Sequence, residues 1–138
     1  MARLRLDVVT AEREVFSDEV EVVVAPGVEG ELGILPRHAP LITMLQPGIM
    51  RLRKDGEETL MAVSGGFLQV FNDRVLVLAD TAERAEEIEE SRAEAARQRA
   101  LAALQNAPPA EAEAARAALR RSLVRLEVAR RRARRTSS

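Results

Sequence analysis

Gly27-Val28-Glu29-Gly30-Glu31-Leu32-Gly33-Ile34-Leu35-Pro36-Arg37-His38-Ala39-Pro40-Leu41 is the stretch around which the rest of the chain is organised. It holds three glycines, two prolines and the only histidine within fifteen positions. Glycine adopts backbone conformations that other residues resist, and proline fixes φ and removes a donor, so a helix cannot run through it. We therefore expect a shaped loop between strands, which presents Leu32–Leu35 as a recognition surface or forms a tight corner.

Composition bounds the class of protein. A chain of 138 residues forms one domain, or one small domain with an appendage. Its residues are 46% hydrophobic but only 2% aromatic, which predicts an aliphatic core. The absence of cysteine excludes disulfides and thiol chemistry. No run of about 18 apolar residues predicts a membrane span, and the start of the chain lacks a signal-peptide core, so the expected location is the cytoplasm.

The net charge of −1 hides an asymmetry along the chain. Residues 1–82 hold 8 basic and 13 acidic side chains, whereas residues 83–138 hold 13 basic and 9 acidic ones. Within the second part the acids crowd the start and the arginines crowd the end. A basic end of this kind favours an acidic partner.

Runs that alternate polar and apolar residues, or that are rich in β-branched residues, predict strands in the first part. Asp55-Gly56 lies between two such runs and is a strong hairpin signal, and Asn72-Asp73 indicates another tight turn. The runs cover residues 3–8, 19–24, 41–45, 49–53, 59–63, 67–71 and 74–78. Closely spaced antiparallel strands of this kind predict a sandwich or a barrel-like pair of sheets.

The pattern changes at Asp80. Asp80-Thr81-Ala82-Glu83 is typical of a helix start, where an Asp or Thr cap is followed by an acid. Residues 88–104 are rich in good helix formers, Asn106-Ala107-Pro108-Pro109 stops that helix, and residues 110–133 are helical again with one apolar face. Two helices joined by a short turn make an αα-hairpin. We therefore predict an α+β chain with an antiparallel β-sandwich in residues 1–82 and a C-terminal two-helix hairpin in residues 83–138.

The apolar faces of the predicted hairpin consist mostly of alanine. Burial of a methyl group contributes roughly 0.8 kcal/mol, against about 1.5–3 kcal/mol for a Leu or Ile side chain. A pair of helices held by methyl groups is held weakly. The hairpin is therefore either a mobile element that separates and binds elsewhere, or a plain solvated appendage.

Three motifs together carry a resemblance to a known family. They are Gly30-Glu31-Leu32-Gly33-Ile34-Leu35-Pro36 with His38-Ala39-Pro40-Leu41, then Pro47-Gly48, then Val63-Ser64-Gly65-Gly66-Phe67. The chain resembles the epsilon subunit of bacterial F-type ATP synthases over about residues 4–130. The resemblance implies a non-catalytic rotor subunit of the central stalk, which couples proton-driven rotation of the c-ring to ATP synthesis. It implies the gamma subunit, the c-ring and the alpha/beta catalytic head as partners. It also implies a peripheral location on the cytoplasmic face of the inner membrane, without membrane insertion.

The resemblance also implies which loop residues meet those partners. Glu31 and His38 would lie near the c-ring, and the apolar piece between them has no reason to be exposed unless it meets a partner. The expected interface with the c-ring and gamma subunit is Glu31, Leu32, Gly33, Ile34 and His38.

A nucleotide site is implied at the start of the first helix. Some members of this family bind ATP through an Ile/Leu-Asp-x-x-Arg-Ala motif together with arginines of the second helix, and guanidinium groups suit phosphates. This chain departs from the motif at Glu89, where the family has Asp. The alternative is a solvated face of i,i+3 and i,i+4 charge pairs. The candidate ATP ligands are Glu83, Ile88, Glu89, Arg92, Ala93, Arg99, Arg121 and Arg125; ATP would be regulatory, and no cofactor or metal is required.

The second helix is the expected inhibitory arm. By resemblance, the hairpin extends toward an acidic segment of the catalytic beta subunit and blocks ATP hydrolysis mechanically. Only Glu127 is acidic among positions 120–135. The arginines of the arm are Arg120, Arg121, Arg125, Arg130, Arg131, Arg132, Arg134 and Arg135.

Other classes of function find little support in the residues. His38 is the only histidine, and a catalytic base needs an orienting partner and a substrate pocket, so no enzyme is predicted. Aromatic residues for base stacking are missing, which argues against nucleic acid as a partner. The remaining rival is a standalone nucleotide-sensing protein, from which co-purification with a gamma-type coiled coil would distinguish the rotor subunit.

Overall fold

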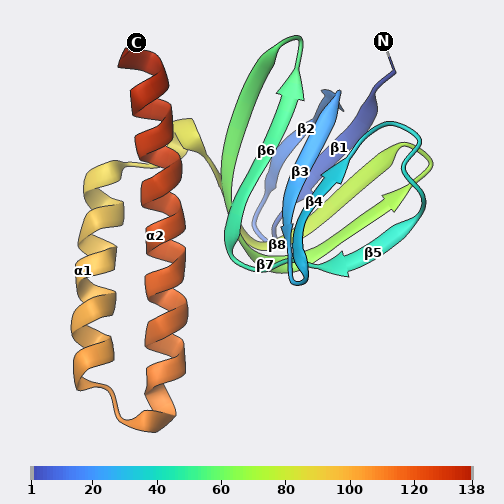
Figure 1. Ribbon diagram of the computed structural model, residues 1–138. Coiled ribbons are helices and arrows are strands. Elements are labelled where there is room, and N and C mark those ends of the chain that lie inside the picture. The colour runs from blue at the N-terminus through green and yellow to red at the C-terminus, as the bar shows by residue number, and fades with distance from the viewer. Residues whose placement is uncertain (1, 138) are drawn as a thin grey trace. The chain divides into compact units, whose positions relative to one another are not determined.

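The computed structural model describes residues 2–137, with side chains described as far as Arg132. The chain divides into two compact units between Arg84 and Ala85. The first unit is built of strands and the second of helices (Figure 1). Within the described residues, no helix is both long enough and apolar enough to cross a membrane.

The described part of the first unit contains eight strands in a single hydrogen-bonded sheet. Their order is β2-β1-β8-β7-β6-β3-β4, and β5 pairs with β7 off this path. All pairs are antiparallel except β1 with β8, which is parallel. The strands are β1 Leu4–Val9, β2 Glu14–Val20, β3 Val22–Gly27, β4 Gly30–Ile34, β5 Leu41–Met44, β6 Gly48–Lys54, β7 Glu57–Phe71 and β8 Arg74–Arg84.

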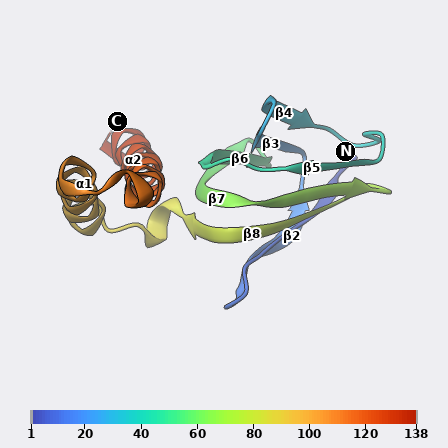
Figure 2. The same cartoon turned by 90° about the horizontal axis from the view of Figure 1, so that it is seen from below.

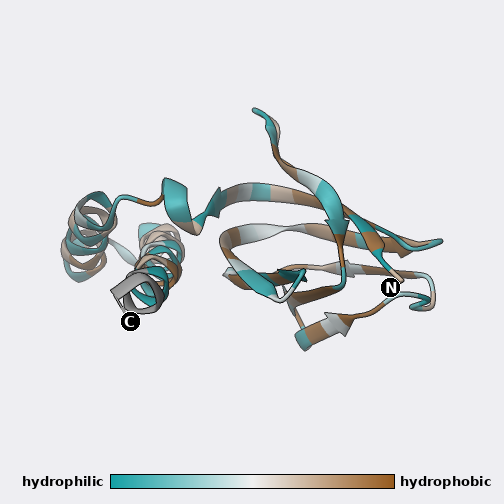
Figure 3. Cartoon of the chain, turned by 90° about the horizontal axis from the view of Figure 1, so that it is seen from above, coloured by the Kyte–Doolittle hydropathy of each residue, from teal (hydrophilic) through white to brown (hydrophobic). Residues whose placement is uncertain are grey.

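The sheet folds over on itself, so that β3, β4 and β6 lie across from β2 and β8 (Figure 2). Hydrophobic and hydrophilic residues alternate along these strands (Figure 3). The expected β-sandwich is therefore confirmed, with the parallel β1–β8 pair as its one departure from the antiparallel pattern. The buried side chains form one aliphatic cluster drawn from both layers, which includes Leu4, Leu6, Val8, Val23, Ile34, Met50, Leu52, Met61, Leu68, Val70, Val75 and Val77.

Strand β7 passes from one layer to the other, and two glycines lie at the bend where it crosses. Residues 57–63 of β7 pair with β6, whereas residues 67–70 pair with β5. Gly65 and Gly66 between these segments have φ of +65° and +104°, which L side chains rarely adopt. A Cβ on Gly66 would lie 2.0 Å from the carbonyl oxygen of Leu78 in β8. The chain therefore needs glycine at this position.

The turns and the central loop follow the sequence in part. Asp55 and Asn72 both have positive φ, so the two predicted tight turns are confirmed. The expected loop over residues 27–41, however, contains strand β4, which pairs with β3 so that Gly27 lies opposite Gly30. Only residues 35–40 form an irregular loop. The prediction of one run over residues 19–24 was also wrong, because the chain turns between Val20 and Val22 into a new strand.

The predicted helix start at Asp80 was wrong, because β8 continues to Arg84. Residues 81–84 pair with residues 61–64 of the long strand β7, and these ladder bonds override the local cap signal. Arg84 also closes the strand: its Nε and Nη2 donate to the carbonyl oxygen of Val15 at 2.8 and 2.6 Å, and its guanidinium lies 5.4 Å from the Phe16 ring centroid. β8 is thus tied at its last residue to β2.

The second unit contains the 3-10 turn η1 Ala85–Glu87, helix α1 Glu90–Asn106 and helix α2 Pro109–Ser137. The helices lie side by side and run in opposite directions (Figure 1), which confirms the predicted hairpin. Pro109 occupies the first position of α2, where its missing N–H has no intrahelical partner to lose. On α1 the buried residues are Ala93 and Ala100, so the alanine-lined interface expected from the sequence is present.

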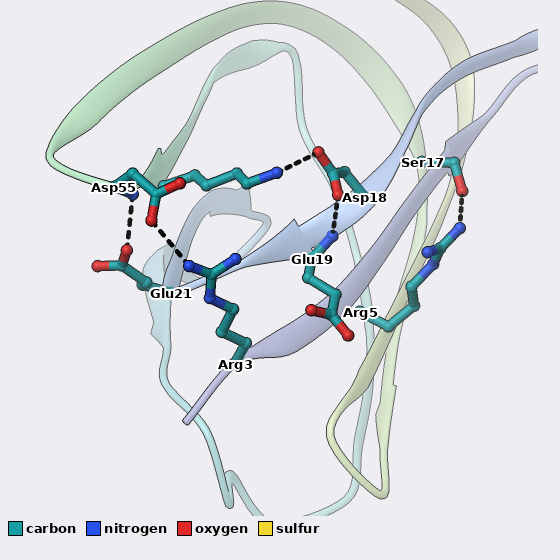
Figure 4. Close-up of polar contacts among 8 residues, drawn as sticks. Arg3, Arg5, Ser17, Asp18, Glu19, Glu21 and Asp55 are labelled. Carbon is teal, nitrogen blue, oxygen red and sulfur yellow. Dashed lines mark hydrogen bonds and ion pairs between the residues drawn. The ribbon is translucent and has the colours of Figure 1, made fainter. Parts of the chain in front are cut away.

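Charged side chains join three separate segments at one end of the β-unit (Figure 4). Arg3 Nη2 pairs with Asp55 Oδ1 at 2.7 Å, and the Asp55 N–H donates to Glu21 at 2.6 Å. Lys54 Nζ donates to Asp18 at 2.7 Å, and this bond, with a neighbouring backbone N–H, lowers the pKa of the Asp18 carboxyl. These exposed pairs help to align the N-terminus, the β2–β3 corner and the β6–β7 turn, but such pairs contribute only about 0–1 kcal/mol each.

The bend in β7 predicts a contrast between two glycine substitutions. We expect Gly66→Ala to destabilise the fold by on the order of 2–4 kcal/mol, because the new Cβ meets backbone atoms of β8 at a φ that alanine resists. Gly33→Ala is the control, since a Cβ at Gly33 has open space, and it should change stability by less than about 0.5 kcal/mol. Urea unfolding measures both, and equal midpoints would contradict the assigned role of Gly66.

Candidate functional site

The β-unit exposes a contiguous set of large apolar side chains on one face of β5, β7 and β8. Met44 lies opposite Phe67, which lies opposite Leu78, so these three form one row across the strands. Ile42 and Phe71 occupy the same face, because alternate residues of a strand point to one side. We call these five residues the apolar face.

The exposure of the apolar face is large for such side chains. The exposed fractions are 71% for Ile42, 54% for Met44, 50% for Phe67, 54% for Phe71 and 49% for Leu78. Contiguous exposed apolar patches mark interaction sites, and Phe and Met are enriched at the cores of interfaces. The apolar face therefore has the composition of a protein-docking surface.

The loop residues predicted as an interface are placed differently from one another. Glu31 is exposed and pairs with Arg51 Nη2 at 2.8 Å. Leu32 and His38 are half-buried, and Gly33 is an exposed residue of β4. Ile34 has no exposed surface and belongs to the core, so its side chain cannot meet a partner. The exposed apolar side chain of this segment is Leu35, at 58%.

Sequence reasoning missed the apolar face. The signal that was available lies in residues 41–44, where apolar residues occupy both sides of a short strand. A strand with two apolar sides has one side to bury in the core and one to offer elsewhere. The strand pairing that places Met44 beside Phe67 is not readable from the sequence.

On helix α1 the candidate arginines share one flank. A helix turns about 100° per residue, so Ala93 and Ala100 define the buried side. Arg92 and Arg99, seven residues apart, lie on one flank of that side, and Glu90 lies on the other. Arg92 and Arg99 therefore share one face of α1.

Helix α2 brings its candidate arginines to the same edge of the hairpin. Arg130 Nε of α2 donates to Glu90 Oε1 of α1 at 3.0 Å. The flank of α2 that carries Arg130 therefore lies beside the flank of α1 that carries Glu90. Relative to the buried Leu126, Arg121 and Arg125 lie on the opposite flank from Arg130. All four candidate arginines of the two helices therefore line one edge, which we call the arginine edge.

The remaining candidate ATP ligands separate into different roles. Arg92 is 80% exposed on its side chain and pairs with Glu89 at 3.4 Å. Glu89 precedes α1 with extended backbone and caps no N–H with its side chain. Ile88 and Ala93 are buried, so they pack the hairpin and do not contact a solvent-side ligand. Glu83 belongs to β8 in the β-unit and does not lie on the hairpin.

The opposite edge of the hairpin carries a compact charge cluster. Arg97 donates to Glu94 at 2.6 and 2.9 Å, and Gln98 donates at 3.0 Å. These bonds, Arg97 first, lower the pKa of the Glu94 carboxyl to about 2. Arg130 lies 3.8 Å from the same carboxylate. Glu94 therefore stays charged across the physiological range of pH.

The arginines of the predicted arm differ in their partners. Arg120, Arg121 and Arg132 are exposed, while Arg131 pairs with Glu127 on its own helix at 2.6 Å. The side chains of Arg134 and Arg135 lie outside the described part of the chain. Among the described residues, no group of three or more acids or histidines is placed to hold a metal ion.

Comparison with known proteins agrees with the fold and with both units. The chain matches the family described as "ATP synthase, Delta/Epsilon chain, beta-sandwich domain" over residues 3–85. It is 57% identical over 134 residues to the ATP synthase epsilon chain of Dehalococcoides mccartyi strain CBDB1, covering 96% of each chain. It is 55% identical over 128 residues to that of Herpetosiphon aurantiacus, covering 91% of this chain and 93% of the relative.

A solved structure is similar over most of the chain. It belongs to the mitochondrial ATP synthase of Euglena gracilis, described as "OSCP/F1/c-ring in rotational state 1". The TM-score is 0.80 at 26% identity, and the match covers 94% of this chain and 82% of that one.

Proposed function

The chain belongs to the ATP synthase epsilon chain family, and we propose that it is a non-catalytic rotor component of the central stalk. In this role it links a proton-driven c-ring to the catalytic head and takes no part in the chemistry of ATP. The similar chain in Euglena gracilis comes from an assembly that includes F1 and the c-ring, which supports this setting. The location that follows is peripheral, on the cytoplasmic face of the inner membrane.

The observation that carries the proposal is the apolar face. A rotor component must be held firmly enough to transmit torque, and buried aromatic and aliphatic anchors supply most of the energy of such contacts. Ile42, Met44, Phe67, Phe71 and Leu78 offer that anchor on rigid strands. We assign this face to the gamma subunit, and the segment with Glu31, Leu35 and His38 to the polar loops of the c-ring.

The hairpin has a regulatory role in this proposal. The four arginines of the arginine edge come from both helices, so a polyphosphate that binds them favours the state in which the helices are adjacent. The Glu89 carboxylate competes with a phosphate group for Arg92, because it already pairs with that side chain. ATP is thus a regulatory ligand of the closed hairpin, and Glu89 weakens its binding relative to the Asp found in the family motif.

The docking assignment predicts a loss of binding without a loss of folding. Phe67→Ser should weaken binding to a gamma–c-ring complex at least about 10-fold, because a buried aromatic anchor is lost. Leu123→Ser, which changes an exposed leucine of the hairpin, should leave the affinity unchanged. Biolayer interferometry on the purified variants measures both. Equal affinities for Phe67→Ser and the parent would remove the apolar face from the interface.

The nucleotide assignment predicts that ATP stabilises the hairpin. ATP at 100 times its dissociation constant should stabilise the bound state by about 2.7 kcal/mol and slow hydrogen exchange in residues 83–130. Arg92→Ala should abolish the effect, and Glu89→Asp should strengthen it. Arg116→Ala is the matched control, since Arg116 also pairs with a glutamate three residues before it but lies away from the arginine edge.

Isothermal titration of these variants, with and without magnesium, decides the matter. If Arg116→Ala removes ATP binding as completely as Arg92→Ala, the ligand responds to the net charge of the hairpin and the arginine edge is no site.

The arm assignment predicts that inhibition depends on charge. Truncation after Ala107 should leave assembly intact and raise ATP hydrolysis, because the strands dock independently of α2. Alanine at Arg120, Arg121, Arg125, Arg130, Arg131 and Arg132 should have nearly the same effect. Inhibition by the parent should weaken with salt, since the Debye length falls from about 10 Å at 0.1 M to about 3 Å at 1 M.

The competing account is that Leu119, Leu123 and Leu126 drive insertion of the arm. Hydrolysis assays on reconstituted complexes separate the two, because the alanine variant keeps all three leucines. If that variant inhibits as strongly as the parent at low salt, charge is not the cause.

A further inference from the structure

The open end of the hairpin carries an ion-pair cluster that spans both helices. Arg130 of α2 lies 3.0 Å from Glu90 and 3.8 Å from Glu94, and both glutamates belong to α1. The ion pairs Arg97–Glu94, Arg116–Glu113 and Arg131–Glu127 join residues three or four positions apart on one helix. The Arg130 contacts therefore differ in kind, since they exist only while the helices are adjacent.

The Arg130 contacts lie where separation of the two helices would break them first. Glu90 is the first residue of α1, and Arg130 lies far along α2, at the end of the hairpin away from the Ala107–Pro108 turn. Helices joined at one end separate most at the other. A contact at the open end is thus broken by any opening, while a contact near the turn survives small openings.

The geometry points to an internal competitor for the inhibitory arm: Glu90 and Glu94 bind Arg130 as a stand-in for an acidic partner surface, and so hold the hairpin closed. We call these three residues the latch. The inference deepens the proposed function, because it rests on an arm that binds acidic groups through its arginines. Within the closed hairpin, Arg130 is already paired and is withheld from such a partner.

The surroundings of the latch keep its ion pairs weak enough to break. Side-chain exposures of 51% for Arg130 and 49% for Glu90 keep the pair in water, where it forms and breaks readily. The buried side of α1 offers only the methyl groups of Ala93 and Ala100 over most of its length. An acidic surface of higher charge density than two glutamates therefore outcompetes the latch, whereas weak or distant anions do not.

The latch is also separate from the arginine edge. Arg92, Arg99, Arg121 and Arg125 lie on the opposite flanks of the two helices. A polyphosphate bound there leaves Arg130 paired, so nucleotide binding and the latch both favour the closed hairpin without sharing a side chain.

The experiment measures hairpin opening in the isolated full chain. The protein has no cysteine, so Ala95→Cys and Leu123→Cys introduce a single pair of spin-label sites on exposed positions of α1 and α2. Distances between the labels by pulsed electron paramagnetic resonance give the open fraction. Glu90→Gln should raise the open fraction about two- to fivefold at low salt, the range set by the loss of one exposed ion pair.

Two further variants isolate the pair from other effects of Glu90. An acid in the first turn also stabilises a helix through its dipole, and Glu111 likewise lies in the first turn of α2, so Glu111→Gln is the control. The exchange Glu90→Arg with Arg130→Glu should bring the open fraction part of the way back to that of the parent, because Glu94 opposes a glutamate at position 130, while each change alone should raise it. Equal open fractions for Glu90→Gln and Glu111→Gln, or no restoration by the exchange, would overturn the latch.

Hydrolysis by reconstituted complexes then tests the arm separately. If Glu90→Gln opens the hairpin and strengthens inhibition, both the latch and the charge-driven arm stand. If Glu90→Gln opens the hairpin and leaves inhibition unchanged, the latch stands and the arm does not act through Arg130.

Discussion

The close approach of β7 and β8 at Gly66 is the constraint on which the β-unit depends. At this point a side chain as small as a methyl group would meet the carbonyl oxygen of Leu78, so the two strands stay paired only because glycine is present. The same passage moves β7 from β6 to β5 and thereby places Phe67 beside Met44. The apolar face is therefore a product of the bend that closes the core.

The sequence predicted the elements whose signals are local. Alternation indicated most strands, the Asp-Gly and Asn-Asp turns were read correctly, and alanine-rich periodicity predicted both helices. Three features escaped because they depend on contacts between distant residues. β8 runs to Arg84 because β7 pairs with it past the cap signal at Asp80. Ile34 is buried because β4 pairs with β3, and the apolar face exists only through cross-strand register.

The hairpin obeys a different balance of forces from the sandwich. The β-unit buries leucine, isoleucine, valine and methionine in one cluster, at about 1.5–3 kcal/mol for each large side chain. The buried side of α1 contributes methyl groups, at roughly 0.8 kcal/mol each. The facing side of α2 adds buried Leu126, so the second core is smaller than the first but is not made of methyl groups alone. Exposed ion pairs contribute about 0–1 kcal/mol, which is negligible beside the first core and a larger share of the second. Charge therefore weighs more in the stability of the hairpin than in that of the sandwich.

We propose that side chains at the two edges of the hairpin stabilise its closed state independently. In the proposed regulation, the arginine edge is the site of a polyphosphate, and the latch is the contact that acidic surfaces and salt weaken. Because the two sets share no side chain, their contributions to the closed state should add as free energies, and their factors in the closing equilibrium constant should multiply. Under this proposal the hairpin is expected to close at high nucleotide and to open when both restraints weaken together. Arg84, at the end of β8, is tied to Val15 within the β-unit and does not belong to either edge of the hairpin.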